Sequence, residues 1–312
     1  MAEGTKKMSK EKFQQIKEIL ANKKFLLRKK NIFIDDRTKD YSSNFGIQWN
    51  KFPLTQFDSY TGYPLTKNRL FNNSGWDFKE LKNKLVIELG SGAGRFTEVL
   101  SSTGCFLVSV EMSDAINVNA NNNKSENIIY LKSSLNNLDF LNNLFDFVLC
   151  YGVAQHTPNL INTYKSCYAF GKDGGKISID HYIKSIYPTT KSIWRPLTKR
   201  INPKILFKII KFYIPYYFPI DTFIKIKLPT FISKLVRCVL PIPCSNYTNV
   251  KDTPQEKKKL VEWAIMDTFD ALGAKYDKPL TFDQLRNIAN KIEISNYQIT
   301  KKGPVLVLNI QK

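Results

Sequence analysis

The residues best suited to chemistry lie in one stretch, residues 84–100, which reads KLVIELGSGAGRFTEVL. An apolar run at 85–89 predicts a buried parallel strand. Glycines follow at positions 90, 92 and 94, and apolar residues at 96, 99 and 100 predict a helix that begins at Arg95. A strand, a glycine turn and a helix bring backbone N–H groups close to a bound nucleotide. A dinucleotide site would need a third glycine at position 95, so another nucleotide is favoured. The alternative is a tight turn without a ligand.

An acid follows at the end of the next predicted strand. Residues 105–110 form a second apolar run that ends on Glu111, 17 residues beyond Gly94. Nucleotide-binding folds place their ribose-binding carboxylate at about this distance from the turn. Glu111 is therefore a candidate to accept hydrogen bonds from both ribose hydroxyls. The alternative is an exposed acid at a strand end.

The only two histidines of the chain follow two neighbouring predicted strands. His156 lies just past the fourth strand and His181 just past the fifth. Ligands bind at the carboxyl ends of such strands, and a histidine can take a proton from a hydroxyl near neutral pH. We expect His181 to be the general base, helped by Asp180 if the chain turns at 180–182, and His156 to line the transfer site. The alternatives are that His156 packs against the cofactor and that Asp180 and His181 form a structural pair.

The pattern along the chain predicts an α/β fold. Seven strands are expected at 85–89, 105–110, 128–132, 144–153, 176–180, 297–301 and 305–310, with helices between them. This alternation predicts a Rossmann-like, doubly wound, seven-stranded sheet with its last strand antiparallel. Over a hundred residues separate the fifth strand from the closing hairpin, which indicates a large, mostly helical insertion between strands 5 and 6.

Four segments follow from this pattern. Residues 1–83 form an N-terminal helix and an aromatic segment packed on the core, and residues 45–65 are candidates to touch the substrate. Residues 84–183 form the nucleotide-binding core, residues 184–280 a helical lid or substrate insertion, and residues 281–312 the closing helix and hairpin. Asp267, Asp270 and Asp277 in the insertion could orient sugar hydroxyls or cap helices.

The motifs together resemble class I methyltransferases that use S-adenosylmethionine (SAM). The resemblance is carried by VIELGSGAGRFTEVL, the acid in VEMS, FDFVLCYGVAQHTP and GGKISIDHY. It implies that SAM is the cofactor and that its methyl group, already activated, passes in line to a nucleophile held close by. It implies the cofactor-binding residues Glu88, Gly90, Ser91, Gly92, Gly94, Arg95, Glu111, Met112, Ser134, Leu135, Tyr151, Gly152 and His156. Ser134 stands where many such enzymes have an adenine-binding Asp.

The composition points to a reducing compartment and to an anionic partner. Five cysteines without a C-x-x-C pair argue against disulfides or a zinc site, and no other metal-binding cluster is visible. The segment MAEGTKKMSKEK has no apolar core of a signal peptide, so we expect a cytoplasmic protein. The net charge is +20, and residues 184–240 contain twelve Lys or Arg against one acid, Asp221. A basic amphipathic helix predicted from Asn202 and Pro203 could form a lid or lie on the inner membrane surface.

These observations predict a SAM-dependent methyltransferase that acts on a small-molecule or glycosyl acceptor, at oxygen. The stretches IWRPLTKRI and EWAIMDTFDALGAKYDKPLTFDQL resemble methyltransferases of bacterial surface-polysaccharide and small-molecule pathways. One alternative acceptor is a lipid or lipid-linked sugar at the membrane. RNA modification rests on net charge alone, without a recognisable RNA-binding module, and a non-catalytic SAM-binding protein is a further alternative. The absence of an N-P-P-Y-type sequence after the fourth strand argues against DNA as a substrate.

Overall fold

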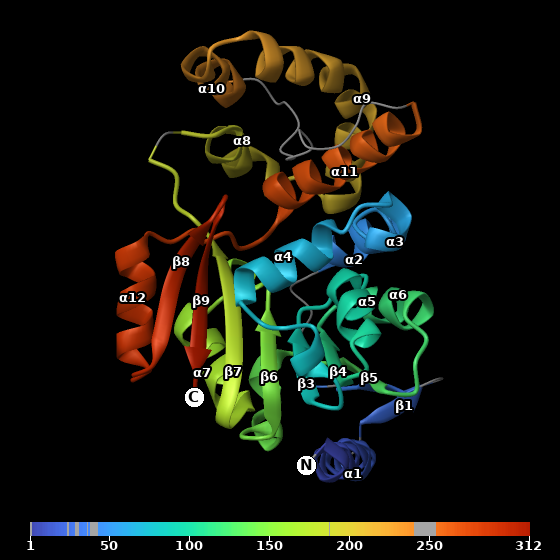
Figure 1. The fold of residues 1–312 in the computed structure, drawn as a ribbon. Coiled ribbons are helices and arrows are strands. Elements are labelled where there is room, and N and C mark those ends of the chain that lie inside the picture. Colours follow the sequence, from blue (N-terminus) through green and yellow to red (C-terminus); the bar gives the residue numbers. More distant parts are fainter. Residues whose placement is uncertain are drawn as a thin grey trace.

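The computed structural model describes residues 2–23, 25–28, 31–35, 37, 43–186, 188–239 and 254–312. Within these residues, nine strands form one sheet in the order β1-β2-β5-β4-β3-β6-β7-β9-β8 (Figure 1). The strands are β1 Leu26–Arg28, β2 Ile32–Ile34, β3 Leu85–Leu89, β4 Phe106–Glu111, β5 Ile128–Lys132, β6 Phe145–Cys150, β7 Gly171–Tyr182, β8 Tyr297–Lys302 and β9 Val305–Gln311.

The seven strands from β3 to β9 confirm the predicted doubly wound sheet. Strands β3 to β7 pair in parallel, and β9 runs antiparallel between β7 and β8. The strand order reverses at β3, because β4 lies on one side of it and β6 on the other. This switch point is where open α/β sheets bind their ligands.

The short hairpin β1–β2 is an addition that the sequence did not predict. It extends the sheet beyond β5, to which β2 pairs in parallel. Each strand has three residues, which is too short for an alternating pattern to stand out among the aromatic and turn-forming residues there.

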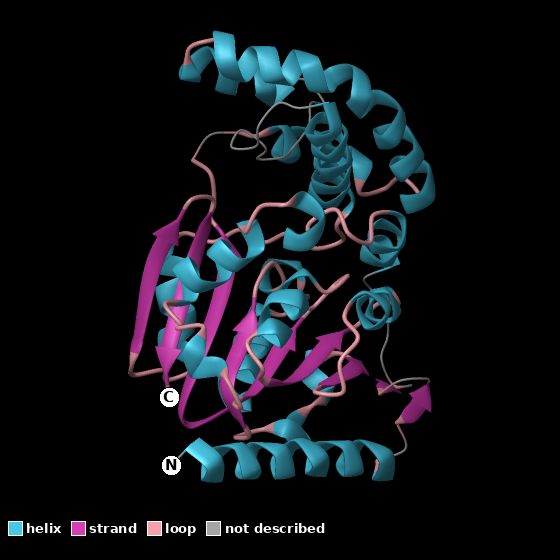
Figure 2. Ribbon diagram, turned by 45° about the vertical axis from the view of Figure 1, so that its right-hand side comes forward, coloured by secondary structure: helices cyan, strands magenta, loops and turns pink. Residues whose placement is uncertain are grey.

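Helices cover both faces of the sheet. On one face Phe96 and Leu100 of α5 (Arg95–Ser102) and Ile116 of α6 (Ala115–Asn122) join a buried cluster. On the other face lie α1 (Ala2–Asn22), α7 (Leu160–Phe170) and α12 (Phe282–Lys291), whose apolar side chains form a second cluster. Phe13, Ile16 and Leu20 of α1 are buried there, so α1 packs firmly against the sheet (Figure 2).

Three helices lead into the first core strand. They are α2 (Ser43–Lys51), α3 (Asp58–Thr61) and α4 (Leu65–Ser74), and they lie between the sheet and the insertion (Figure 1). Asp58 fixes the start of α4, because its carboxylate accepts hydrogen bonds from the backbone N–H groups of Thr66 and Lys67. Short 3-10 helices follow at Lys79–Leu81, Leu135–Asn137, Asp139–Leu141 and Ala154–His156.

The insertion is helical, with its own apolar core. Its helices are α8 (Thr190–Thr198), α9 (Pro203–Lys227), α10 (Thr230–Val239) and α11 (Pro254–Gly273), which stand above the carboxyl ends of the strands (Figure 1). Ile210 and Ile214 of α9 pack with Ala264 and Phe269 of α11. Asn202 caps α9 by accepting a hydrogen bond from Lys204 N at 3.0 Å. None of the described helices has the length and apolarity needed to cross a membrane.

Candidate active site

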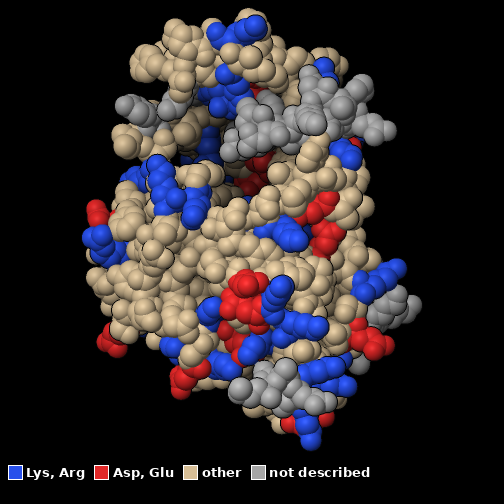
Figure 3. Space-filling model, in the orientation of Figure 1, with Lys and Arg blue, Asp and Glu red and all other residues tan. Residues whose placement is uncertain are grey.

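A cavity of about 1950 Å³ lies between the carboxyl ends of the central strands and the insertion. Its wall combines the glycine turn, the ends of β4, β6 and β7, residues 48–57, and side chains from α8, α10 and α11. Figure 3 shows the hollow, with basic side chains at its rim and acidic side chains in its depth. The volume accommodates a nucleotide-sized cofactor together with an acceptor.

The glycine turn after β3 forms the floor of the cavity. Gly90 has φ of 71° and Gly94 has φ of 97°, a region that favours glycine. A Cβ at Gly90 would overlap the Val153 side chain, and one at Gly94 would overlap Asn119. Gly90 and Gly92 line the cavity, whereas Gly94 packs beneath it against α6. The prediction that Gly94 touches the cofactor is therefore corrected: this glycine lets the turn and the helix approach each other.

Two acids that the sequence assigned to the cofactor have different surroundings. Glu111 lines the cavity, and its carboxylate accepts hydrogen bonds from Gly92 N at 3.0 Å and Ser113 N at 2.8 Å. These bonds hold the carboxylate at the end of β4, where it suits a ribose. Glu88 lies outside the cavity wall, and burial raises its pKa to about 7. It accepts a hydrogen bond from Thr97 Oγ1 at 2.5 Å, so it ties β3 to α5 and supports the turn from below.

The remaining residues predicted to bind the cofactor lie along the cavity wall. These residues are Ser91, Arg95, Met112, Ser134, Leu135, Tyr151, Gly152 and His156. The Ser134 hydroxyl accepts a hydrogen bond from Asn136 N at 3.4 Å, which orients it at the end of β5. The Tyr151 hydroxyl is hydrogen-bonded to Ser178 Oγ at 2.6 Å. The ring of Tyr151, rather than its hydroxyl oxygen, therefore contributes to the cavity wall.

Two half-buried arginines meet at the cavity. Arg95 lies over the Phe96 ring at 4.8 Å, and burial lowers its pKa to about 10, an effect that the charge of Arg69 reinforces. Arg69, on α4, forms an ion pair with Asp180 at 2.5 Å. The glycine turn, Glu111 and these two guanidinium groups fit a ligand with a ribose and a carboxylate, which SAM has.

Sequence reasoning missed Arg69. It stands among ordinary polar residues of α4 without a motif, and only the packing of α4 against α5 and β9 brings it to the site.

Asp180 is a positioning residue in this arrangement. Its side chain is completely buried and does not line the cavity. One carboxylate oxygen accepts the hydrogen bond of Gly152 N at 2.5 Å, and the other pairs with Arg69. Asp180 therefore joins the loop after β6 to α4. Its predicted catalytic role is corrected, because it has no access to an acceptor.

His181 does not fit the predicted role of general base. Its ring is completely buried outside the cavity wall. Nε2 donates a hydrogen bond to the Lys278 carbonyl at 2.7 Å, and Nδ1 accepts one from the Tyr164 hydroxyl at 3.0 Å. Burial lowers its pKa to about 4, which keeps the ring neutral. Strand β7 stays extended through Tyr182, so Asp180 and His181 face opposite sides and the expected pair does not form.

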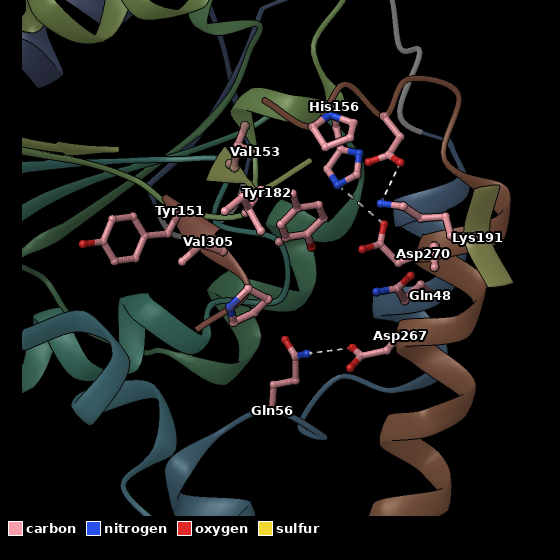
Figure 4. Close-up of a pocket in the computed structure, with 18 of the residues that line it drawn as sticks. Gln48, Gln56, Tyr151, Val153, His156, Tyr182, Lys191, Asp267, Asp270 and Val305 are labelled. Atoms are coloured by element: carbon pink, nitrogen blue, oxygen red, sulfur yellow. Dashed lines mark hydrogen bonds and ion pairs between the residues drawn. The ribbon is translucent and has the colours of Figure 1, made fainter. Parts of the chain in front are cut away.

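His156 has the geometry that suits a base. It ends the short helix after β6, lines the cavity and packs edge-on against Tyr182. Nδ1 lies 2.8 Å from the Tyr276 carbonyl, which can only accept a hydrogen bond, so Nδ1 carries the proton. Nε2 lies 3.9 Å from the Asp270 carboxylate, so the nitrogen that can accept a proton lies beside an acid (Figure 4).

Further polar side chains line the same cavity. Asp267 on α11 lies near Gln56, whose amide donates a hydrogen bond to it at 3.4 Å (Figure 4). Burial and the charge of Asp270 raise the pKa of Asp267 to about 7. Lys191 pairs with Asp277 at 2.6 Å at the same wall. The three insertion aspartates all line the cavity, as do Gln48, Trp49, Pro53, Gln56 and Phe57 from residues 45–65.

Among the described residues, no group of three or more His, Cys, Asp or Glu side chains is arranged to hold a metal ion. Cys105, Cys150 and Cys167 are buried free thiols.

Comparison with known proteins identifies the domain. Residues 87–179 match the family model described as "Methyltransferase domain". A "Ubiquinone biosynthesis O-methyltransferase" from Coxiella burnetii is 28% identical over 100 residues, which are 31% of this chain and 43% of that protein. The chain thus matches under half the length of this relative. It contains a methyltransferase domain of the class I, SAM-dependent type, as its sequence predicted, and SAM is the cofactor of that domain.

Solved structures show the same kind of similarity at lower identity. A structure described as a putative S-adenosyl-L-methionine-dependent methyltransferase from Methanococcus maripaludis has a TM-score of 0.47 and 14% identity, covering 89% of this chain and 96% of that one. A phosphoethanolamine N-methyltransferase 2 from Haemonchus contortus, bound to S-adenosylhomocysteine, has a TM-score of 0.39 and 13% identity, covering 82% and 46%.

Proposed function

We propose that this protein transfers the methyl group of SAM to a hydroxyl oxygen of a small polar acceptor, such as a glycosyl group. The observation that carries the proposal is His156, which lines the cavity with its Nε2 3.9 Å from Asp270 and its Nδ1 proton held by a backbone carbonyl. An oxygen nucleophile needs a base, and this histidine lies at the carboxyl end of a central strand, next to the glycine turn.

In this proposal the residues of the chain bind SAM and the acceptor, orient them toward each other, and remove a proton from the acceptor hydroxyl. Glu111 would hold the ribose hydroxyls, and Arg95 with Arg69 would attract the carboxylate of the methionine part. When bound, SAM supplies a methyl group that is already activated by a sulfonium. His156 Nε2 accepts the proton of the acceptor hydroxyl, and Asp270 stabilises the imidazolium. The wall residues hold the reactants in line and at contact distance, which is the main catalytic contribution expected for such a transfer.

The acceptor site is assigned to the insertion and to residues 48–57. Gln48, Gln56, Asp267 and Asp270 place amide and carboxylate groups along the cavity wall that His156 also lines, and such groups suit the several hydroxyls of a sugar (Figure 4). The curated relatives support oxygen as the acceptor atom, since they are named O-methyltransferases. We also propose that the chain is organised in the segments that its sequence predicted. Residues 184–280 are the insertion that binds the acceptor, and the other segments support it.

A lipid or lipid-linked sugar is the second candidate acceptor. Apolar side chains of Ile193, Phe231 and Leu235 line the outer part of the cavity and remain exposed, which suits a hydrocarbon chain. In that case the protein would work at the inner membrane surface rather than in the bulk cytoplasm.

The experiment uses the purified protein, SAM carrying a labelled methyl group, and panels of sugar nucleotides, free phenols and lipid-linked sugars. The proposal predicts label in a product whose methyl group resists mild base, as an ether does, and at least a hundredfold slower transfer for His156→Gln. Label on nitrogen or carbon would contradict the proposed acceptor atom. SAM binding without transfer to any member of the panels would favour the non-catalytic alternative.

A further inference from the structure

A continuous row of apolar side chains lies exposed along α9. The row consists of Ile205, Ile209, Phe212, Tyr216, Ile220, Phe223 and Ile226, which are between 46% and 73% exposed. We call these seven residues the outer row of α9. They follow one another at spacings of three or four residues, so they share one face of the helix. At 1.5 Å per residue the row is about 30 Å long.

The opposite face of α9 is fully used. Leu206, Ile210, Ile214, Phe218 and Ile224 are buried, most of them against α11. α9 therefore packs on the rest of the protein through its opposite face, and the outer row takes no part in that packing. Monomeric proteins rarely expose a contiguous apolar surface of this length, and one flanked by polar residues marks an interaction site.

The charges around the outer row have one sign. Lys204, Lys208, Lys211 and Lys227 are exposed on α9. The single acid of the helix, Asp221, is completely buried and paired with Lys225 at 2.9 Å and Arg237 at 2.7 Å. The outer surface of α9 thus combines an apolar row that contains three aromatic rings with lysines and no carboxylate.

We propose that the outer row of α9 docks on an anionic lipid bilayer, with the helix lying in the plane of the interface. Helices that bind in this way have an apolar face with aromatic residues and a lysine-rich polar flank. Each lysine near an anionic surface contributes to attraction. The described helices include none that could span a membrane, so the contact is with the surface. The proposal does not depend on methyl transfer.

Charge also argues against a second copy of the chain as the occupant. A two-fold contact places the same patch on both subunits. Pairing the outer row with itself would place the lysines of both helices along one contact without an exposed acid on either helix to balance them. An anionic bilayer supplies the opposite charge over the whole length of the row.

The test is flotation of the full-length protein with vesicles of phosphatidylcholine alone or mixed equally with phosphatidylglycerol, at 0.15 M salt. We expect binding to the mixed vesicles only. The variant Lys204→Glu/Lys208→Glu/Lys211→Glu should bind at least about a hundredfold more weakly. Phe212→Ser/Phe223→Ser should also lose binding at least tenfold, because both rings are exposed and their removal leaves the core intact.

A matched control keeps the test specific. The variant Lys82→Glu/Lys124→Glu/Lys291→Glu changes the net charge equally at exposed positions far along the chain from α9, and its binding should stay within about threefold of wild type. Thermal melts and SAM titrations should be unchanged in all three variants. The proposal is overturned if no vesicle binds the protein, if neutral and mixed vesicles bind it equally, or if the control variant loses binding as strongly as the α9 variant. A dimer that Phe212→Ser/Phe223→Ser dissociates, without lipid binding, would overturn it in favour of a subunit interface.

Discussion

The two histidines should respond in opposite ways to the same substitution. His156→Gln removes a group that faces the cavity, whereas His181→Gln removes a group enclosed between Tyr164 and the Lys278 carbonyl. Glutamine has a similar polar end but takes up no proton near neutral pH. Comparing the two variants therefore distinguishes the loss of a catalytic base from the loss of a buried structural contact.

For His156→Gln the expected loss is in rate. Removing a general base typically costs 10²–10⁴ in turnover, while the structural cost should be small because the side chain lines the cavity and the glutamine amide can donate a hydrogen bond to the Tyr276 carbonyl in its place. SAM affinity should change by less than about threefold if the base acts on the acceptor alone. The limb of the pH–rate profile that reports deprotonation of the base should be absent in His156→Gln.

For His181→Gln the expected loss is in stability. A buried partner left without its hydrogen bond costs about 1–3 kcal/mol, so the free energy of unfolding at pH 7 should fall by about 2 kcal/mol. The pKa of His181 is lowered from 6.5 to about 4. The unfolded chain therefore binds the proton first as the pH falls, and wild type loses up to about 3 kcal/mol of the His181 contribution between pH 6.5 and pH 4. Glutamine does not titrate, so the cost of His181→Gln should shrink over that window.

The assays are denaturant unfolding at pH 7 and pH 4.5 and methyl transfer with the acceptor found in the panels. Comparing the variant with wild type at each pH cancels the opposite contributions of Glu88 and Asp267, whose raised pKa values make stability fall as the pH rises toward 7. A hundredfold loss of turnover in His181→Gln at unchanged stability, with normal turnover in His156→Gln, would refute the assignment.

Further predictions concern the cofactor and the support of the site. Glu111→Ala should weaken SAM binding by roughly 1.5–3 kcal/mol in calorimetry, the range for hydrogen bonds to a charged group, and an unchanged Kd would place the ribose elsewhere. Asp180→Ala should lower the free energy of unfolding by about 1.5–3 kcal/mol, the range for a lost hydrogen bond to a charged group, because it removes the buried carboxylate that pairs with the half-buried Arg69, and a loss under 1 kcal/mol in denaturant unfolding would contradict the role of the pair.

The sequence predicted what local pattern determines. The apolar runs and the glycine turn predicted β3 to β6 and their helices, because each of these elements has its own period and boundary signals. Asn202 and Pro203 likewise predicted the start of α9. The helix runs on to Lys227, although Pro215 and Pro219 favoured an earlier end, since packing against α11 compensates for the missing backbone hydrogen bonds.

The sequence could not predict what distant contacts determine. In the sequence, His181 and His156 each follow a predicted strand and look alike. In the fold, Tyr164 and Lys278 enclose His181. Tyr276 and Asp270 instead orient His156. Asp180 looked like a partner of its neighbour and is instead the partner of a residue on α4. These assignments depend on contacts between residues that lie about a hundred positions apart in the sequence, and the spacing of residues along the chain does not predict such contacts.

The most direct test of the account is a calorimetric titration of the full-length protein with SAM, with NAD as the comparison. The account predicts a micromolar Kd for SAM, about −7 to −8 kcal/mol, and no measurable heat with NAD. Binding of NAD without binding of SAM would contradict the assignment of this cavity to a methyl donor.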